Sequence, residues 1–379
     1  MTASRATRVA RTQLGLECLQ ARVMPAVVVT QLDLDADGTA DDIRIVGDNA
    51  KNLVTVQDNA AGVLTVSVDA NGDGDFTDAG EKNGVSYLYS GNSVIFDVNL
   101  SANNDSFAYS LTNNVMAGRR DFAVDLGLGN DTFTLDATGK NFTNGSQLGV
   151  DLVGQAGIDI ANITVGHIDA STAAIALDLG LGNDTSAVKF GNIDIKGSVD
   201  IDANLGVGAN TVTLDLDGVG KFDQGYASVN ITGGTGVDTV TVNLHDDVGN
   251  GTLTSALMIN VVLSDNNDAF TANMDYDKST FRVDDHSIAS INVHGGAGND
   301  TLIAQGIGAI GTIKIDADAL LDINLKGDTG DDTVKVNFSK TDGLDLQGSL
   351  RAWLDGGAGN DKLTAAFANN ANSCLLYTS

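Results

Sequence analysis

The stretch Gly295-Gly296-Ala297-Gly298-Asn299-Asp300-Thr301 is a glycine-rich turn with an Asn-Asp pair, followed by a β-type run. Its clearest other copies occupy residues 126–132, 179–185, 233–239, 327–333 and 356–361, and more degenerate copies end at Asp105, Asp159, Asn210 and Asp268. Successive turns are 25 to 32 residues apart. So narrow a spread over ten units indicates a repeat architecture with a period of about 28 residues.

The length of this period indicates which repeat architecture the chain adopts. Propeller blades need about 40 residues, and nonapeptide rolls repeat every 9, so neither fits. The runs beside the turns alternate in polarity as half-buried strands do, for example Val240–Leu244 and Val334–Phe338. We therefore expect an all-β protein: an elongated β-solenoid, or parallel β-helix, of about ten coils with two or three short strands each. A string of small β-sandwiches is the second choice, because one unit is too short to make a sandwich.

The chain divides into four parts on this interpretation. Residues 1–26 are basic, with Arg5, Arg8, Arg11 and Arg22, and form a leader or targeting segment. Within them Leu16–Arg22 resembles the Leu-Glu-x-Leu-x-x-Arg head of some large exported bacterial proteins. Residues 27–96 form a small β region and residues 97–372 the solenoid. Residues 373–379 end in Cys374–Ser379, which match a sequencing-adapter reading frame, so we exclude them and expect the natural chain to continue.

The charge is extreme and of one kind. Lys and Arg number 21 against 50 acidic residues, for a net charge of −29, and all the acids but Glu17 and Glu81 are Asp. This balance argues against nucleic acid and anionic membrane surfaces, which need basic patches. No apolar run approaches the roughly 18 residues of a membrane span. Cations or basic partners are the natural counterparts of such a chain, and Asp is a short oxygen ligand for hard cations.

Two loops before the repeats carry the strongest cation pattern. Residues 33–41 read D-x-D-x-D-G-x-x-D, and residues 69–81 resemble an EF-hand-type loop with its closing carboxylate one position late. Alternate oxygens point inward and a glycine at position 6 allows the sharp bend. Both loops follow β-type runs, so we expect strand-loop-strand units. The candidate Ca²⁺ ligands are Asp33, Asp35, Asp37, Thr39 (through its carbonyl), Asp41, Asp69, Asn71, Asp73, Asp75, Asp78 and Glu81, with either Asp78 or Glu81 closing the second loop.

The repeat turns themselves resemble the haemolysin-type (RTX) calcium repeat, G-G-x-G-x-D-x-u-x. The resemblance is closest at 233–238, 295–300, 327–332 and 356–361. It implies Ca²⁺ at Asp131, Asp184, Asp238, Asp300, Asp332 and Asp361, although the family uses closely spaced nonapeptides and this chain has one turn per coil. Stacked carboxylates about 4.8 Å apart would repel by roughly 3.5 kcal/mol at an effective dielectric of 20, which a divalent cation would relieve. The alternative is an exposed, metal-free turn closed by glycine and Asn-Asp side-chain bonds.

Catalytic patterns are absent from the sequence: the four His have no metal-ligand spacing, and no G-x-S-x-G, P-loop or paired-Cys motif occurs. We expect a calcium-binding, exported structural or adhesive protein of a bacterial cell surface or extracellular matrix. Its partners would be calcium, and surface polysaccharide or other surface proteins. The alternative is a β-helix carbohydrate-active enzyme, a lyase or hydrolase, for which Asp246-Asp247 and Asp284-Asp285-His286 are candidate acids.

Overall fold

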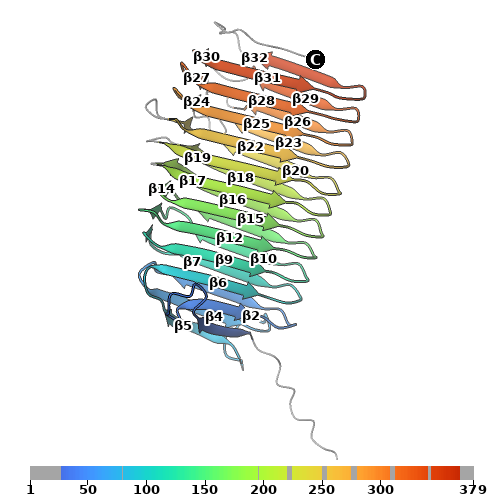
Figure 1. Cartoon of the computed structure of the whole chain (residues 1–379). Helices are drawn as coiled ribbons and strands as arrows, with labels where there is room; N and C mark the ends of the chain where they lie inside the picture. Colours follow the sequence, from blue (N-terminus) through green and yellow to red (C-terminus); the bar gives the residue numbers. More distant parts are fainter. Residues whose placement is uncertain are drawn as a thin grey trace, which may run out of the picture.

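The computed structural model describes residues 27–78, 80–194, 196–219, 224–249, 254–274, 280–307, 312–339 and 343–367. These residues form an all-β solenoid of about nine parallel turns with a period of about 28, preceded by a small β region (Figure 1). The predicted fold class is confirmed, with about nine turns where ten were expected. No helix in the described ranges could serve as a membrane span. The expected leader and the adapter-like tail lie outside the described residues.

One wall of the solenoid is a 12-stranded sheet, called sheet A here. Its strands follow each other along the rod at one per turn, and every pair but the first is parallel. In order they are β1 (Val28–Leu32), β2 (Asp42–Val46), β6 (Ser93–Asn99), β9 (Arg119–Asp125), β12 (Gln147–Val153), β15 (Thr172–Asp178), β17 (Gly197–Asn204), β19 (Gly225–Thr232), β22 (Ala256–Val262), β25 (Ile288–His294), β28 (Leu320–Lys326) and β31 (Ser349–Asp355).

The remaining 20 strands make the second wall, called sheet B. Its main strands are β3 (Leu53–Asp58), β4 (Val63–Asp69), β5 (Lys82–Leu88), β7 (Ser106–Leu111), β10 (Thr132–Ala137), β13 (Ile160–Val165), β16 (Thr185–Asp194), β18 (Thr211–Val219), β20 (Thr239–Leu244), β23 (Ala269–Met274), β26 (Thr301–Gly306), β29 (Thr333–Phe338) and β32 (Lys362–Phe367). A short third strand completes most turns: β8 (Val115–Met116), β11 (Phe142–Thr143), β14 (Ile168–Asp169), β21 (Asp247–Val248), β24 (Phe281–Val283), β27 (Thr312–Ile315) and β30 (Gly343–Leu346). The expected two or three strands per coil are confirmed.

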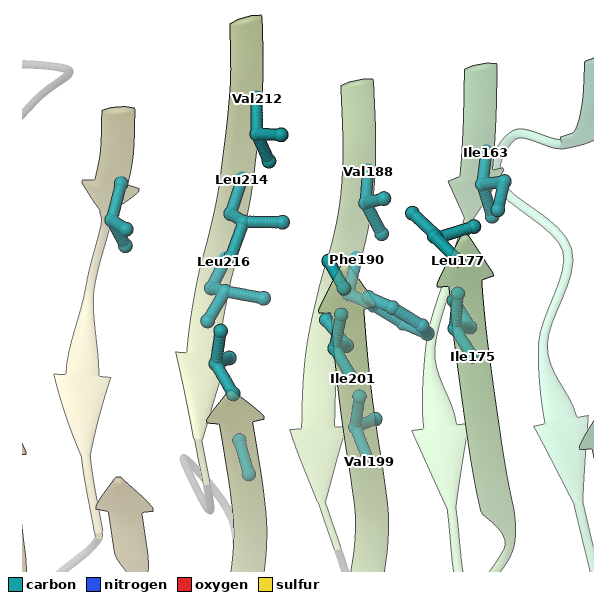
Figure 2. Close-up of a cluster of buried hydrophobic side chains, with 14 of the residues drawn as sticks. Ile163, Ile175, Leu177, Val188, Phe190, Val199, Ile201, Val212, Leu214 and Leu216 are labelled. Atoms are coloured by element: carbon teal, nitrogen blue, oxygen red, sulfur yellow. The ribbon is translucent and has the colours of Figure 1, made fainter. Parts of the chain in front are cut away.

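The core is a single column of aliphatic and phenylalanine side chains between the two sheets. Ile175 and Ile201 of sheet A point toward Val188, Phe190 and their neighbours on sheet B (Figure 2). Each strand contributes alternate residues, as its two-residue side-chain period requires. The buried cluster runs without interruption from Val27 to Leu354, because one coil can bury its apolar face only against the next. The expected boundary at residue 96 falls inside β6, so the first β region shares this core.

The glycine-rich turn is where the coils approach most closely. Eight of the turns have a glycine two positions before the turn Asp or Asn, and all eight, from Gly129 to Gly359, have a positive φ between 137° and 155°. The N–H of this glycine donates to the next coil, as from Gly157 to Leu181 O at 2.8 Å. A Cβ on Gly157 or Gly182 would overlap the carbonyl oxygen of the equivalent glycine in the preceding coil. Only glycine satisfies both the backbone conformation and this spacing.

The N-terminal end is closed by strands of opposite sense. β1 pairs antiparallel with β2, while β3, β4 and β5 form an antiparallel meander beside the parallel strand β7. Beneath this closure Arg120 and Asp58 form a fully buried ion pair at 2.5 Å. The hydroxyls of Tyr89 and Tyr109 donate to the two Asp58 carboxylate oxygens at 2.8 and 2.6 Å. Burial, more than the neighbouring Asp58, raises the pKa of Tyr89 to about 12. The network ties β3, β7 and β9 together.

We predict that Gly157→Ala will cost several kcal/mol of unfolding free energy, because the methyl group would enter the stacked backbone below it. The matched control is Gly139→Ala. Gly139 also has a positive φ, but a Cβ there meets nothing within 4 Å, so it should lose only the roughly 1–2 kcal/mol of left-handed strain. Urea unfolding followed by circular dichroism measures both. Equal losses would mean that coil spacing does not dictate glycine.

Arg120→Ala should destabilise the protein by about 3–5 kcal/mol, because it leaves the Asp58 carboxylate buried without its cation. Arg44→Ala removes an exposed ion pair with Asp97 in the neighbouring strands and should cost under about 1 kcal/mol. Chemical denaturation of the two variants tests the contrast. A similar small loss for both would show that the buried pair contributes little to the closure.

Candidate functional site

The two acidic loops occupy the N-terminal end and connect paired strands. The first joins β1 to β2 and the second joins β4 to β5. Both connected pairs are antiparallel. The expected strand-loop-strand arrangement is thus confirmed for both. In each loop the first Asp is the last residue of a strand or the residue directly after it. The carboxylate of this Asp therefore faces the bend at the glycine.

The two loops share one hydrogen-bond pattern, position by position. The position-1 carboxylate accepts the N–H of the position-6 glycine: Asp33 from Gly38 at 3.1 Å and Asp69 from Gly74 at 2.9 Å. These glycines have φ of 93° and 94°. The side chains at positions 3 and 5 each accept the N–H two residues further on, in both loops. Two segments of different sequence therefore fold into the same oxygen-lined bend.

The closing carboxylates also correspond, but not as the sequence indicated for the first loop. Glu81 accepts the position-2 N–H of Ala70 at 3.2 Å through one oxygen and the N–H of Asp78 at 2.9 Å through the other. In the first loop the buried Asp42 accepts the position-2 N–H of Leu34 at 2.7 Å. Asp41, the expected closing ligand, is buried and accepts the N–H and hydroxyl of Ser90 through its Oδ2. Asp42 is the residue that sequence reasoning missed.

Carboxylate oxygens converge in each loop. Asp33, Asp35 and Asp37 bring three oxygens within 4.8 Å of one another, and Asp69, Asp73 and Glu81 do the same. In the first loop the Asp37 N–H favours the charged form of Asp35, but desolvation and the charges of Asp37, Asp42 and Asp33 outweigh it and raise the Asp35 pKa. A cation would relieve this repulsion. Hard oxygen donors on a flexible loop are the donor set that suits Ca²⁺.

The other candidate residues of the loops lie at their edges. Asp75 accepts the N–H and hydroxyl of Thr77, which lower its pKa. Asp78 accepts the Asn71 side-chain amide at 2.8 Å. The same amide donates to Asp73 at 3.3 Å, which holds Asn71 across the bend. Thr39 is exposed, and its N–H donates to Asp37.

The turn aspartates of the repeats form a buried ladder. The Oδ1 of each accepts the backbone N–H of the equivalent residue in the preceding coil, as in Asp131 to Asp159 and Asp268 to Asp300 at 2.8 and 2.7 Å. The ladder comprises Asn52, Asp105, Asp131, Asp159, Asp184, Asn210, Asp238, Asp268, Asp300, Asp332 and Asp361. All but Asp361 are buried, so the expected stacking is confirmed. The alternative turn, closed by positive-φ glycine and Asn-Asp side-chain bonds, is wrong only in exposing the Asp, since its glycine conformation and its side-chain bonds are present and Leu128 and Asn130 are exposed. These Oδ1 bonds give the aspartates a structural role, and Ca²⁺ at Asp131, Asp184, Asp238, Asp300, Asp332 and Asp361 stays a prediction of the resemblance.

The Asn of the Asn-Asp pair forms a second ladder with the opposite direction. Asn130 Oδ1 accepts the N–H of Ile158 in the following coil at 2.9 Å, and Asn299 accepts that of Asp331 at 2.8 Å. The ladder stops wherever this position holds Ile158, Ala209 or Val237, which have no side-chain oxygen. Where both residues are present, the Asn-Asp pair thus bonds a turn to the coils on both sides of it.

Two further acidic groups lie away from the loops. Asp284, Asp285 and Asp316 form a group of carboxylates, and the Arg282 guanidinium forms ion pairs with Asp284 at 2.9 Å and with Asp316. Lys314 pairs with Asp316 at 2.9 Å. Asp215, Asp217 and His245 form the other group, in which His245 and Lys189 hold Asp215. Basic side chains already neutralise much of the negative charge of both groups. These ion pairs connect neighbouring coils, so neither group leaves a cluster of carboxylates without counter-charges.

The outer face of sheet A carries a shallow hollow of about 430 Å³ across β9, β12, β15 and β17. Gly149, Ala174 and Ala176 line it with small side chains, and four carboxylates border it, those of Asp121, Asp151, Asp200 and Asp202. A second hollow lies beside the exposed Trp353 near β31.

We predict that Asp42→Ala will lower the unfolding free energy by about 2 kcal/mol, because the partly buried backbone N–H groups of Leu34 and Ile95 would lose a charged acceptor. It should also weaken any cation bound at the first loop without removing a member of the Asp33–Asp37 group. Thermal unfolding with and without Ca²⁺ measures both effects. Asp345→Ala, an exposed change on β30, is the control; a loss no greater than in this control would contradict the role of Asp42.

Comparison with known proteins identifies no relative: no family model matches the chain, and no curated protein and no solved structure matches it either. The resemblance of the turns to haemolysin-type repeats is supported at a coarser level. The chain is a β-solenoid of about nine turns with clusters of aspartates, which is consistent with that class of repeat.

Proposed function

We propose that this chain is a calcium-binding structural module of an exported bacterial protein, with the two acidic loops as its calcium sites. The observation that carries the proposal is the shared hydrogen-bond pattern of the loops, in which a carboxylate closes on a glycine N–H at matching positions. Independent sequences would have little reason to fold into one oxygen-lined bend unless both met the same chemical requirement. Calcium, which takes six to eight oxygen ligands in irregular geometry, meets it.

In this proposal Asp33, Asp35 and Asp37 hold one ion and Asp69, Asp73 and Glu81 hold the other. Asn71, the backbone carbonyls of the bends and water would complete the shells. Binding would hold β1 against β2 and β4 against β5, and so stiffen the closure at the N-terminal end of the rod. The ion would act on stability and shape.

The long uniform rod supports a scaffold or adhesive role on a cell surface or in an extracellular matrix. Its sheet A face offers a bordered hollow for a surface polysaccharide or a protein partner. The alternative of a β-helix carbohydrate-active enzyme fits the same fold. Incubation with acidic and neutral polysaccharides separates the two, because an enzyme would generate shorter chains and a scaffold would only bind them.

We predict that the protein binds two calcium ions and melts at a higher temperature in millimolar Ca²⁺ than in chelator. A ligand at 100 times its Kd adds about 2.7 kcal/mol to the native state. Asp73→Ala and Asp35→Ala should each remove one ion from the stoichiometry measured by calorimetry. The control Asp345→Ala should keep both.

Two results would contradict the proposal. One is an identical melting curve in Ca²⁺ and in chelator. The other is an unchanged stoichiometry in both loop variants, which would place any bound calcium elsewhere. Unchanged binding in only one variant would restrict the proposal to the other loop.

A further inference from the structure

The second hollow on the outer face of sheet A lies across the neighbouring strands β25, β28 and β31 (Figure 1). Its volume is about 280 Å³, close to the lower end of the roughly 300–1,000 Å³ of small-molecule sites, so it suits a single small ring. The residues that line it are Asn292, Asp322, Asn324, Arg351, Ala352 and Trp353. One large aromatic side chain is thus combined with four hydrogen-bonding side chains.

Trp353 provides the apolar surface of the hollow. It is the single tryptophan of the chain, and it is 49% exposed. An exposed hydrophobic side chain needs no explanation when it stands alone. Trp353 does not stand alone, because polar side chains beside it have donors and acceptors that the protein does not use. Indole rings in such surroundings are typical of binding sites, since they combine a large apolar face with a polar edge.

The strand register determines which side chains surround the indole ring. Trp353 on β31 is paired with Asn324 on β28, and Asn324 is paired in turn with Asn292 on β25. Two positions earlier in the same strands, Arg351 is paired with Asp322. Residues two positions apart in a strand point to the same face. The five side chains therefore form two adjacent columns on the outer face.

Asparagines in the column of Trp353 form a hydrogen-bonded ladder that stops at the hollow. The Asn230 side-chain amide donates to Asp202 at 2.8 Å. Asn260 donates to Asn230 at 3.0 Å, and Asn292 donates to Asn260 at 3.2 Å. The next rung would join Asn324 to Asn292, but the Asn324 side chain makes no hydrogen bond in the part of the chain that the structure describes. Its amide therefore offers both a donor and an acceptor to the hollow.

Asp322 and Arg351 bring opposite charges to the hollow without pairing with each other. They are register partners, yet within the described ranges neither forms an ion pair. A carboxylate can only accept hydrogen bonds, and a guanidinium can only donate them. A ligand that satisfies both must therefore carry donors and acceptors together, and it needs no net charge.

The charge of the whole molecule also favours a neutral ligand. The net charge of −29 repels polyanions. Within the hollow the one acidic and the one basic side chain balance each other. Hydroxyl groups both donate and accept hydrogen bonds. A sugar ring carries several hydroxyls at its rim and an apolar face of C–H bonds, so it matches both the polar and the aromatic parts of this lining.

We propose that this hollow binds a pyranose ring of a neutral polysaccharide. The C–H face of the sugar stacks on the electron-rich face of the Trp353 indole. The hydroxyls at the rim bond to the Asn324 amide, to the Asp322 carboxylate and to the Arg351 guanidinium. The inference names the partner class for the adhesive role proposed above, on which it rests, and it does not involve the calcium loops at the N-terminal end.

Tryptophan fluorescence reports directly on the hollow, because Trp353 is the only tryptophan of the chain. The test titrates the full chain, in millimolar Ca²⁺, with three neutral polysaccharides: dextran, mannan and galactan. Alginate is the acidic comparison. We expect at least one neutral polymer to shift the tryptophan emission and to bind in calorimetry, and we expect alginate to do neither.

Three variants, measured by calorimetry, assign the binding to the hollow. Trp353→Ala should weaken it by about tenfold or more, as the loss of an aromatic anchor does. Asn324→Ala should weaken it by a smaller factor, because one hydrogen-bonding group is lost. Tyr226→Ala is the matched control and should leave it unchanged. Tyr226 is another exposed aromatic residue of sheet A, at 41%, but it lies outside the hollow. Melting curves check that each variant is folded.

The proposal is overturned if none of the neutral polymers binds, or if alginate binds in preference to them. It is also overturned if Trp353→Ala binds as tightly as Tyr226→Ala, which would place the glycan elsewhere. Self-association that is lost in Trp353→Ala, without any glycan binding, would assign the surface to a second copy of the chain instead. The calcium sites are tested by melting curves and this hollow by emission and calorimetry, so the two proposals fail separately.

Discussion

The in-register stacking of one coil on the next is the constraint on which the rest of this structure depends. Parallel strands repeat along the rod at one spacing, and the turns must follow at the same spacing, because they too are bonded from coil to coil. No side chain fits where Gly129, Gly157 and Gly182 stack. Once this spacing is fixed, every residue of a coil lies beside its equivalent in the neighbouring coils. Apolar residues then form the hydrophobic column, turn residues form the two polar ladders, and outward-facing residues form the outer surface.

Much of the fold could be predicted from the sequence, because the coils of a solenoid appear in the sequence as repeats of similar length. The spacing of the turns gave the period, and alternation in segments such as Val240–Leu244 identified the strands, which the structure confirms as β20. The depth of the turn could not be predicted. Asp is usually an exposed turn residue, and only the coil-to-coil hydrogen bonds show that Asp131 or Asp300 points inward. Leu or Gly occupies the position five residues earlier, and the leucines there, such as Leu126 and Leu179, are buried.

The acidic loops show the converse. Their local pattern predicted the strand-loop-strand units and the convergence of Asp33, Asp35 and Asp37 correctly. It failed at the closing residue of the first loop, since Asp41 and Asp42 are adjacent and one register step in β2 decides which faces the bend. Side-chain positions within a loop can be predicted from the sequence when the backbone conformation depends only on neighbouring residues. The sequence cannot place side chains whose direction is set by a strand pairing with a distant segment, here β6 and Ser90.

The antiparallel strands at the N-terminal end have a consequence for self-association. A second copy could extend a parallel stack in sheet A only by presenting a strand of the same sense to the unpaired edge, but the edge strand β1 runs against the direction that the rest of the sheet uses. Exposed strand edges are the usual starting points of fibril growth, and reversed or irregular edges are a common protection. The sheet A edge at this end is therefore a poor template for head-to-tail polymerisation along the axis of the rod.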